Sequence, residues 1–311
     1  MRLVTSTGDF SGYLPTITER IEYFKNTQFK YINLEQGASA PQMADEGEGW
    51  KALVDEWGNA AAKAGLTFAA AHAPCVNVFG KNLDEETYRK NMTILRNSLK
   101  ICGELGIKRT VVHACGHSSF TGYDFWVKNK EFYSDMFDLM EKYELIVMTE
   151  NMDGVYPFST GHDLRHFVDF VDHPLMGVCW DIAHGHNNPR ANRKGQYQCI
   201  TDIGDKLKGL HVADNFGDGP HQHTWPFAGT VNFDSVLQAL KDINYDGDFT
   251  LEASYTLLHS QNIPYHRQAW EHNGETVTTL LNPPIELKRQ AVDLLYNVGK
   301  YMLDTYGCFE A

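Results

Sequence analysis

Short apolar runs recur along the chain at intervals of about 30 to 40 residues, the length of one strand–helix unit. Each run is rich in Val, Ile, Leu, Phe or Ala and is short enough to form a buried parallel strand. Eight runs are therefore predicted as strands: residues 3–5, 31–35, 67–72, 110–113, 145–150, 176–181, 209–211 and 249–252.

Amphipathic patterns fill the gaps between these runs and predict helices. One has Pro15 in its first turn, where proline is favoured, and two end at Gly65 and Gly106, since glycine is favoured just after the end of a helix. The predicted helices are 15–28, 50–64, 84–105, 129–143, 161–171, 232–243 and 283–306, and the longest loops are 182–198, 215–231 and 253–282. Strands that alternate with helices in this way predict one domain, a (β/α)8 TIM barrel over residues 1–311. A doubly wound open sheet usually has a glycine-rich phosphate turn after its first strand, whereas Gly8 and Gly12 stand alone.

The composition narrows the classes of function. Asp and Glu total 40 against 27 Lys and Arg, a formal charge of −13, so the chain is a poor binder of nucleic acid or anionic membrane. No apolar run approaches the roughly 18 residues of a membrane span, and the N-terminus lacks the apolar stretch of a secretory signal. The six cysteines include no C-x-x-C pair and are expected as reduced thiols, with Cys75, Cys115 and Cys179 as small core residues. These features predict a cytoplasmic protein.

Seven consecutive predicted strands, the second to the eighth, deliver a His, Asp or Glu at their ends. In a barrel these ends meet at one face, where active sites form. Carboxylates in a closed site repel one another unless a cation lies between them, and carboxylate with imidazole is the ligand set of divalent metals. The sequence therefore predicts a divalent metal ion, with its identity among Mn, Zn, Mg and Co left open. The strand-end residues are Glu35, His72, His113, Glu150, Asp181, His211 and Glu252, and His184 follows Asp181.

An ordered series of short motifs surrounds these residues: INLEQ, HAP, VVH, TEN, WDIAH, HVADN and TLEAS, with HQHTWPFAGTVNFDSVLQAL before the last. In this order, the series resembles the sugar isomerase/epimerase superfamily of xylose isomerase-like barrels. That group includes ketose 3-epimerases, hydroxypyruvate isomerase-like proteins and inosose dehydratases, and the endonuclease IV nucleases are its relatives. The series as a whole is specific for the superfamily and does not select a substrate.

The resemblance implies a single metal ion held by Glu150, Asp181, His211 and Glu252. It also implies that Glu150 and Glu252 lie on opposite faces of a sugar and exchange protons with it. Proton transfer from a carbon next to a carbonyl needs a base, and it needs a cation to stabilise the enediolate that forms. The chemistry and the resemblance therefore agree.

Further residues are expected to contact the substrate. His184 resembles the family's contact to a substrate oxygen, and Glu35 is placed to bind a substrate hydroxyl or to orient His72. The loops above the strand ends have almost no Lys or Arg but several aromatics, including Trp126 and Trp225, which suits a neutral polyol. The expected partner is a small carbohydrate. The oligomeric state is open, with a homo-oligomer paired through the late helices as one outcome.

Two other functions are alternatives to this interpretation. The nuclease relatives hold three zinc ions, and the same resemblance would recruit His72, His113, His184 and His223 as further ligands or substrate contacts. Their Asp-x-His motif reads HQH at 221–223, which argues against a third metal. The first alternative is thus a multinuclear zinc phosphoesterase of the AP-endonuclease type, and the second is a polyol-binding barrel without turnover. The preferred interpretation is a metal-dependent isomerase or epimerase, or a dehydratase with the same parts, acting on a sugar, sugar acid or cyclitol.

Overall fold

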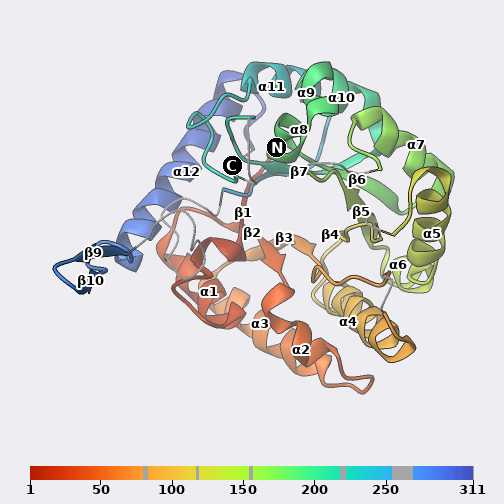
Figure 1. Cartoon of the computed structure of the whole chain (residues 1–311), viewed down its shortest axis with the longest axis horizontal. Coiled ribbons are helices and arrows are strands. Elements are labelled where there is room, and N and C mark those ends of the chain that lie inside the picture. The colour runs from red at the N-terminus through yellow and green to blue at the C-terminus, as the bar shows by residue number, and fades with distance from the viewer. Residues whose placement is uncertain (80–82, 117–118, 154–156, 218–221, 254–268, 311) are drawn as a thin grey trace.

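A closed barrel of eight parallel strands, ordered β1 to β8, forms the centre of the molecule, and Figure 1 shows the helices around it. The computed structural model describes residues 1–79, 83–116, 119–153, 157–217, 222–253 and 269–310. The strands are β1 (Leu3–Ser6), β2 (Tyr31–Glu35), β3 (Thr67–His72), β4 (Arg109–Val111), β5 (Ile146–Glu150), β6 (Met176–Asp181), β7 (Leu207–Val212) and β8 (Phe249–Leu251). The predicted (β/α)8 TIM-barrel fold is confirmed.

At least one helix follows each barrel strand. Helices α1 and α7 begin with capping boxes, in which Thr16 pairs with Glu19 and Thr160 with Asp163. The helices are α1 (Ile17–Tyr23), α2 (Ala40–Met43), α3 (Trp50–Ala64), α4 (Glu85–Glu104), α5 (Gly122–Ser134), α6 (Phe137–Tyr143), α7 (Gly161–Val171), α8 (Ile182–Asn187), α9 (Pro189–Lys194), α10 (Gln196–Ile203), α11 (Phe233–Asp242) and α12 (Ile285–Thr305). Gly65 and Gly106 follow the ends of α3 and α4 with positive φ, as predicted. Pro15 was expected in a first helical turn, and this was wrong, because α1 begins at Ile17 after its cap Thr16.

The segment 129–143, expected as one helix, is divided between α5 and α6. Arg96 of α4 donates hydrogen bonds to the backbone carbonyl of Asp135 and to the carboxylate of Asp138. The bond to the Asp135 carbonyl satisfies a backbone group that a continuous helix would have satisfied internally, and the bonds to Asp138 hold the first turn of α6. The break thus depends on a contact with another helix, which the local pattern does not encode.

The prediction of a loop at residues 182–198 was wrong, because most of this segment is helical. Asp181 caps α8 by accepting the backbone N–H of His184 at 2.5 Å. Asn188 caps α9, which has Pro189 in its first turn, and α10 packs against α7 and α11. Helices of six to eight residues are too short to show a clear amphipathic period, so the pattern resembled a loop.

The register of the barrel places the predicted site residues at one end. His72 pairs with Glu35 of the neighbouring strand, and His211 pairs with Asp181. His113 lies two residues after the end of β4, and Glu252 lies one residue after the end of β8. The carboxyl ends of the strands therefore converge on one face, as the barrel fold requires.

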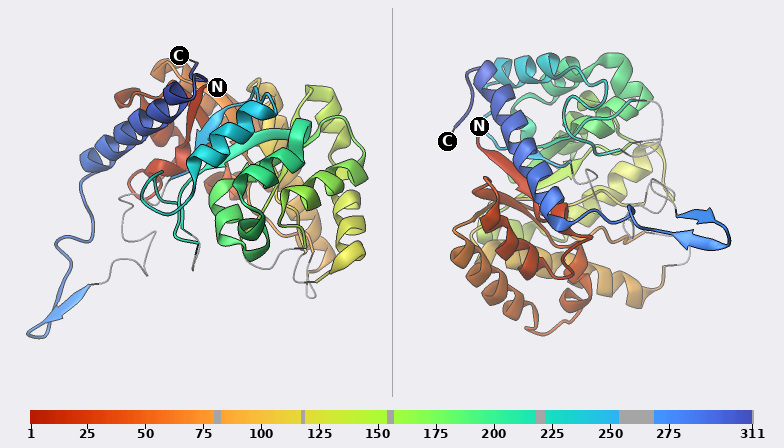
Figure 2. Two further views of the ribbon diagram at one scale, coloured as in Figure 1. Left: turned by 90° about the horizontal axis from the view of Figure 1, so that it is seen from above. Right: turned by 90° about the vertical axis from the view of Figure 1, so that its left-hand side faces the viewer.

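A two-stranded hairpin, β9 (Trp270–His272) and β10 (Glu275–Val277), lies within the predicted loop 253–282. Figure 2 shows it extending away from the barrel. Most of the remaining loop, residues 254–268, lies outside the described residues. Among the described residues, no helix combines the length and the apolar character needed to cross a membrane.

Candidate metal and catalytic site

Four side chains from the ends of β5 to β8 converge. One ligand atom each of Glu150, Asp181, His211 and Glu252 lies within 4.8 Å of the other three. Nδ1 of His211 lies 3.1 Å from Oε1 of Glu150 and 3.1 Å from Oε2 of Glu252, and it lies 4.0 Å from Oδ2 of Asp181. The side chain of Glu252 is 18% exposed and the other three are buried, so Glu252 is the most accessible member of the cluster.

Glu150 and Glu252 are held in their ionised forms. Burial acts to raise the pKa of Glu150, but the charge and hydrogen bonds of His211 and His113 hold it well below its usual range. Burial also opposes ionisation of Glu252, and His211 again outweighs it and lowers the pKa. Protons on the imidazoles thus balance the carboxylates, and a metal ion can replace such protons because its ligands bind deprotonated.

The two carboxylate oxygens of Asp181 have different surroundings, which bear on whether these residues suit a metal ion. Its Oδ1 accepts the His184 N–H, whereas Oδ2 is buried without a hydrogen-bond partner among the described residues. A buried polar atom of this kind is rare and indicates an ion or a water molecule at the site. Asn151 fixes the backbone of Asp181, accepting its N–H at 2.7 Å and donating to its carbonyl at 2.8 Å. Three carboxylates, one imidazole and an oxygen without a partner therefore fit a divalent metal ion.

His184 and His223 form a pair beside this cluster. Nδ1 of His184 lies 2.8 Å from the carbonyl oxygen of Asn151, and Nδ1 of His223 lies 3.2 Å from that of Glu252. A carbonyl only accepts, so both Nδ1 atoms carry protons, and the two Nε2 atoms face each other at 3.2 Å. Burial lowers the pKa of His184, but nearby carboxylates, first among them Asp181, raise it to about 10. The paired Nε2 atoms are thus placed to share a proton, a metal ion or a substrate hydroxyl.

The loop that carries His223 is organised by Asp214, a residue that sequence reasoning did not single out. The buried carboxylate of Asp214 accepts four backbone N–H groups at 2.8–3.0 Å, those of Asn215, Phe227, Gly229 and Val231. Its backbone also pairs with Thr224, next to His223 and Trp225. Trp225 is half-buried against the core. The Asp of the HVADN motif was the available signal for this role.

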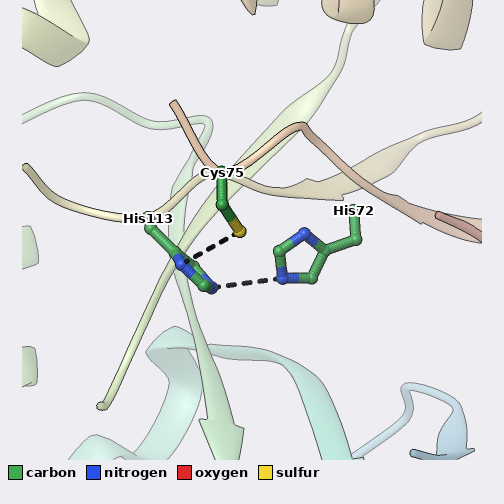
Figure 3. Close-up of side chains that lie close together, drawn as sticks. All are labelled: His72, Cys75 and His113. Carbon is green, nitrogen blue, oxygen red and sulfur yellow. Dashed lines mark hydrogen bonds between the residues drawn. The ribbon is translucent and has the colours of Figure 1, made fainter. Parts of the chain in front are cut away.

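His72, Cys75 and His113 gather on the other side of Glu150, at the ends of β3 and β4 (Figure 3). Oε2 of Glu150 lies 3.0 Å from Nε2 of His113 and 3.5 Å from Nε2 of His72. Cys75 was predicted as a core residue, and this was wrong, since it is exposed. Cys115 and Cys179 are buried as predicted. The available signal for Cys75 was its place three residues after His72 in HAPC.

Glu35 and Trp126 have different surroundings. Glu35 accepts a hydrogen bond from Asn33 at 2.9 Å, and burial raises its pKa although the neighbouring His72 lowers it. Glu35 therefore lies within reach of the strand-end cluster. The ring of Trp126 on α5 contacts Phe167 and Phe170 of α7 at centroid distances of 5.8 and 5.7 Å. These contacts place Trp126 between two helices, and its role as a substrate contact stays a prediction.

Residues 21–273 match the family model of the xylose isomerase-like TIM barrel. The chain belongs to this family. Uncharacterized protein MJ1311 of Methanocaldococcus jannaschii is 27% identical over 191 residues, which cover 58% of this chain and 62% of MJ1311. The match therefore spans less than two thirds of that relative. Fructoselysine 3-epimerase of Escherichia coli O157:H7 is 22% identical over 209 residues, which cover 64% of this chain and 73% of the epimerase.

Two solved structures share the fold. D-psicose 3-epimerase with D-tagatose from Clostridium cellulolyticum H10 has a TM-score of 0.72 at 14% identity, covering 97% of this chain and 99% of the epimerase. The IolI protein, whose structure holds a zinc atom, has a TM-score of 0.62 at 17% identity, covering 82% of this chain and 89% of IolI. At these identities the likeness shows the xylose isomerase-like fold.

Proposed function

We propose that this chain is a metal-dependent sugar isomerase or epimerase, which moves a proton at a carbon next to a carbonyl through an enediolate. The observation that carries the proposal is the placement of two ionised carboxylates, those of Glu150 and Glu252, each 3.1 Å from Nδ1 of His211. They come from β5 and β8, which are separated by two strands of the barrel. Carboxylates that approach from different sides can act as bases on two faces of one substrate. The names of the epimerases that resemble this chain support a ketose or ketose derivative as the substrate.

Glu150, Asp181, His211 and Glu252 would hold the metal ion, and the Oδ2 atom of Asp181 supports this placement. A divalent cation there supplies positive charge to the substrate oxygen on which negative charge develops. The zinc atom in IolI supports a divalent metal in this fold. The ligand set suits Mn2+, Co2+, Zn2+ or Mg2+.

The protein side chains divide the proton transfer between them. One glutamate removes the proton and later releases it to solvent, and in an epimerase the other returns a proton, taken up from solvent, to the opposite face. The low pKa of Glu150 and of Glu252 keeps each carboxylate ionised in the free chain, which is the form that can accept a proton. His184, oriented by the carbonyl of Asn151, presents its other ring nitrogen for contact with a substrate oxygen.

The charges near the site support a neutral sugar over a phosphate-containing substrate. Arg190 lies 2.9 Å from Asp163, and Lys194 lies 3.5 Å from Asp202, so acidic partners engage two of the three cationic residues in the segment after β6. A nuclease must contact a phosphate backbone with Lys and Arg, and the net charge of −13 opposes this. These observations favour an isomerase or epimerase over a phosphoesterase.

The test is a screen of ketoses, sugar acids and inososes with the chain loaded with Mn2+, Co2+, Zn2+ or Mg2+, with chromatographic detection of a new isomer. We expect metal-dependent interconversion that a chelator abolishes. Glu150→Gln and Glu252→Gln should each lower the rate at least about 100-fold, as expected for loss of a general base. Glu86→Gln, an exposed glutamate in the first turn of α4, is the control and should keep the full rate. Wild-type rates in either site variant, or no conversion by the loaded wild type across the panel, would refute the proposal.

A further inference from the structure

A surface groove lies between the loop that leads into α11 and the last turns of α12, on the outside of the barrel (Figure 1). Its volume is about 500 Å3, within the range of roughly 300–1,000 Å3 that small-molecule sites occupy. The Tyr306 hydroxyl donates to Oδ1 of Asp234 at 2.6 Å and so joins the two walls of the groove. The described lining residues include no member of the four-residue cluster, so this groove is separate from the proposed metal site.

Two aromatic rings are exposed at the groove. Phe227 of the loop is 59% exposed, and Tyr301 of α12 is 64% exposed. Their ring centroids lie 6.5 Å apart, with the ring planes inclined by 65°, and the Phe227 ring also meets Phe233 edge to face at 5.8 Å. A single exposed apolar residue is ordinary, but exposed rings that meet at a cavity indicate a binding surface.

The backbone of Phe227 is strained. Its φ of 75° lies in the left-handed region that favours glycine, where a bulky side chain is an outlier. The buried carboxylate of Asp214 holds this conformation by accepting the N–H groups of Phe227 at 3.0 Å and of Gly229 at 2.9 Å. Strain of this kind costs free energy and is concentrated at sites that contact ligands. Since most of the Phe227 ring stays exposed, packing within the chain recovers little of that cost, and contact with a ligand would account for it.

The chemistry of the lining selects a class of ligand. Asp234 is the one charged residue among the described lining residues, and together with the net charge of −13 it opposes binding of a phosphate or carboxylate. The side chains of Thr230, Thr305 and Tyr306 add hydroxyl groups beside the two rings. A sugar ring has apolar C–H faces that stack on aromatic rings and hydroxyls that bond to groups of this kind. The lining therefore suits a neutral polyol.

We propose that this groove binds the ring of a neutral sugar or cyclitol, stacked on Phe227 and Tyr301, with the carboxylate of Asp234 accepting hydrogen bonds from its hydroxyls. The groove is a second carbohydrate site, outside the mouth of the barrel. None of the residues that form it takes part in the proposed proton transfer, so the inference does not rest on the proposed function.

The test is saturation-transfer difference NMR with D-glucose, D-fructose and myo-inositol as probes, on chain treated with a chelator so that the proposed metal site holds no ion. We expect saturable transfer to at least one probe in wild type. Tyr301→Ala and Phe227→Gly should each raise the dissociation constant at least about 10-fold, and Tyr301→Phe, which keeps the ring, should stay within about 3-fold of wild type. Tyr123→Ala is the matched control, because Tyr123 on α5 is 68% exposed and does not line the groove.

Phe227→Gly also reports on the strain, through its Tm. Glycine adopts a φ of 75° without steric penalty, so the Tm of this variant should equal or exceed that of wild type although binding is weakened. A clear fall in Tm would show that the ring is held for packing and would overturn the role assigned to Phe227.

The other outcomes are equally distinct. No saturable transfer to any probe, or wild-type binding in Tyr301→Ala and Phe227→Gly, would overturn the site. Tighter binding of choline than of the sugars would overturn the ligand class, because two rings beside a carboxylate also suit a cation. A shift from dimer to monomer in Tyr301→Ala on size-exclusion chromatography would make the groove an interface between copies of the chain and would overturn the proposal. Binding confined to metal-loaded chain and lost in Asp181→Asn would place the sugar in the barrel, which supports the proposed function and contradicts the second site.

Discussion

Asp181→Asn tests the four-residue metal site with little disturbance of the fold. Asparagine keeps an oxygen that can accept the His184 N–H at the start of α8, as Oδ1 of Asp181 does. It replaces the buried Oδ2 with an amide group and removes one of three clustered negative charges. The metal-free variant is therefore expected to be about as stable as metal-free wild type, because the repulsion from Glu150 and Glu252 that it loses offsets the attraction of protonated His184 that it also loses. Its affinity for a divalent metal ion should fall sharply.

The size of the effect follows from linkage. A metal ion at 100 times its dissociation constant stabilises the folded chain by about 2.7 kcal/mol. If the substitution weakens binding about 100-fold, the same concentration equals the dissociation constant, and the stabilisation falls to about 0.4 kcal/mol. At about 2 °C per kcal/mol for a chain of this size, the metal should raise Tm by about 5 °C in wild type and by about 1 °C in the variant.

The assay is thermal unfolding followed by circular dichroism, with Mn2+ chosen because it prefers the oxygen ligands that predominate in the four-residue cluster. Each protein is measured metal-free and with a fixed excess of the ion. An equal metal-induced rise in Tm for wild type and Asp181→Asn would show that the ion binds elsewhere. A large fall in Tm of the metal-free variant would refute the reasoning that the third carboxylate is repelled by its neighbours.

Two further predictions concern the surroundings of the site. Asn151→Leu removes the two side-chain hydrogen bonds to the buried N–H and carbonyl of Asp181. It should lower the free energy of unfolding, measured in urea, by about 2–4 kcal/mol. A loss below about 1 kcal/mol would mean that water replaces these bonds. In Gly161→Ala the new Cβ would lie 1.8 Å from the carbonyl oxygen of Cys199. The free energy of unfolding should therefore fall by about 1–3 kcal/mol or more. A variant with unchanged stability would contradict the packing of α10 on α7.

The barrel strands and most of their helices could be predicted because they follow local rules. Residues 31–35, 67–72 and 176–181 form strands with the predicted bounds, and 50–64 and 161–171 form helices with the predicted bounds. Buried parallel strands read as short apolar runs, and caps and glycines mark helix ends. The convergence of Glu150, Asp181, His211 and Glu252 followed from the same logic, since each lies at the end of a barrel strand.

Other features depend on contacts between distant segments. The break between α5 and α6 is bonded by Arg96, which lies about 40 positions earlier in the chain. Asn151 and Asp214 hold neighbouring backbone, a role that residue type alone does not reveal. Cys75 has an ordinary apolar context in HAPC, and its exposure beside His113 depends on the path of the chain after β3. Such details need the packed structure.

The most direct test of the two-carboxylate mechanism is exchange with solvent deuterium, followed by proton NMR on a substrate pair from the screen. Wild type loaded with metal in D2O should place deuterium at the carbon next to the carbonyl in both isomers. If the reaction is an epimerisation, Glu150→Gln and Glu252→Gln should each block interconversion while still exchanging one epimer, with opposite preference, because the remaining carboxylate reaches one face. Conversion without deuterium uptake, or exchange of both epimers in a single variant, would contradict the account.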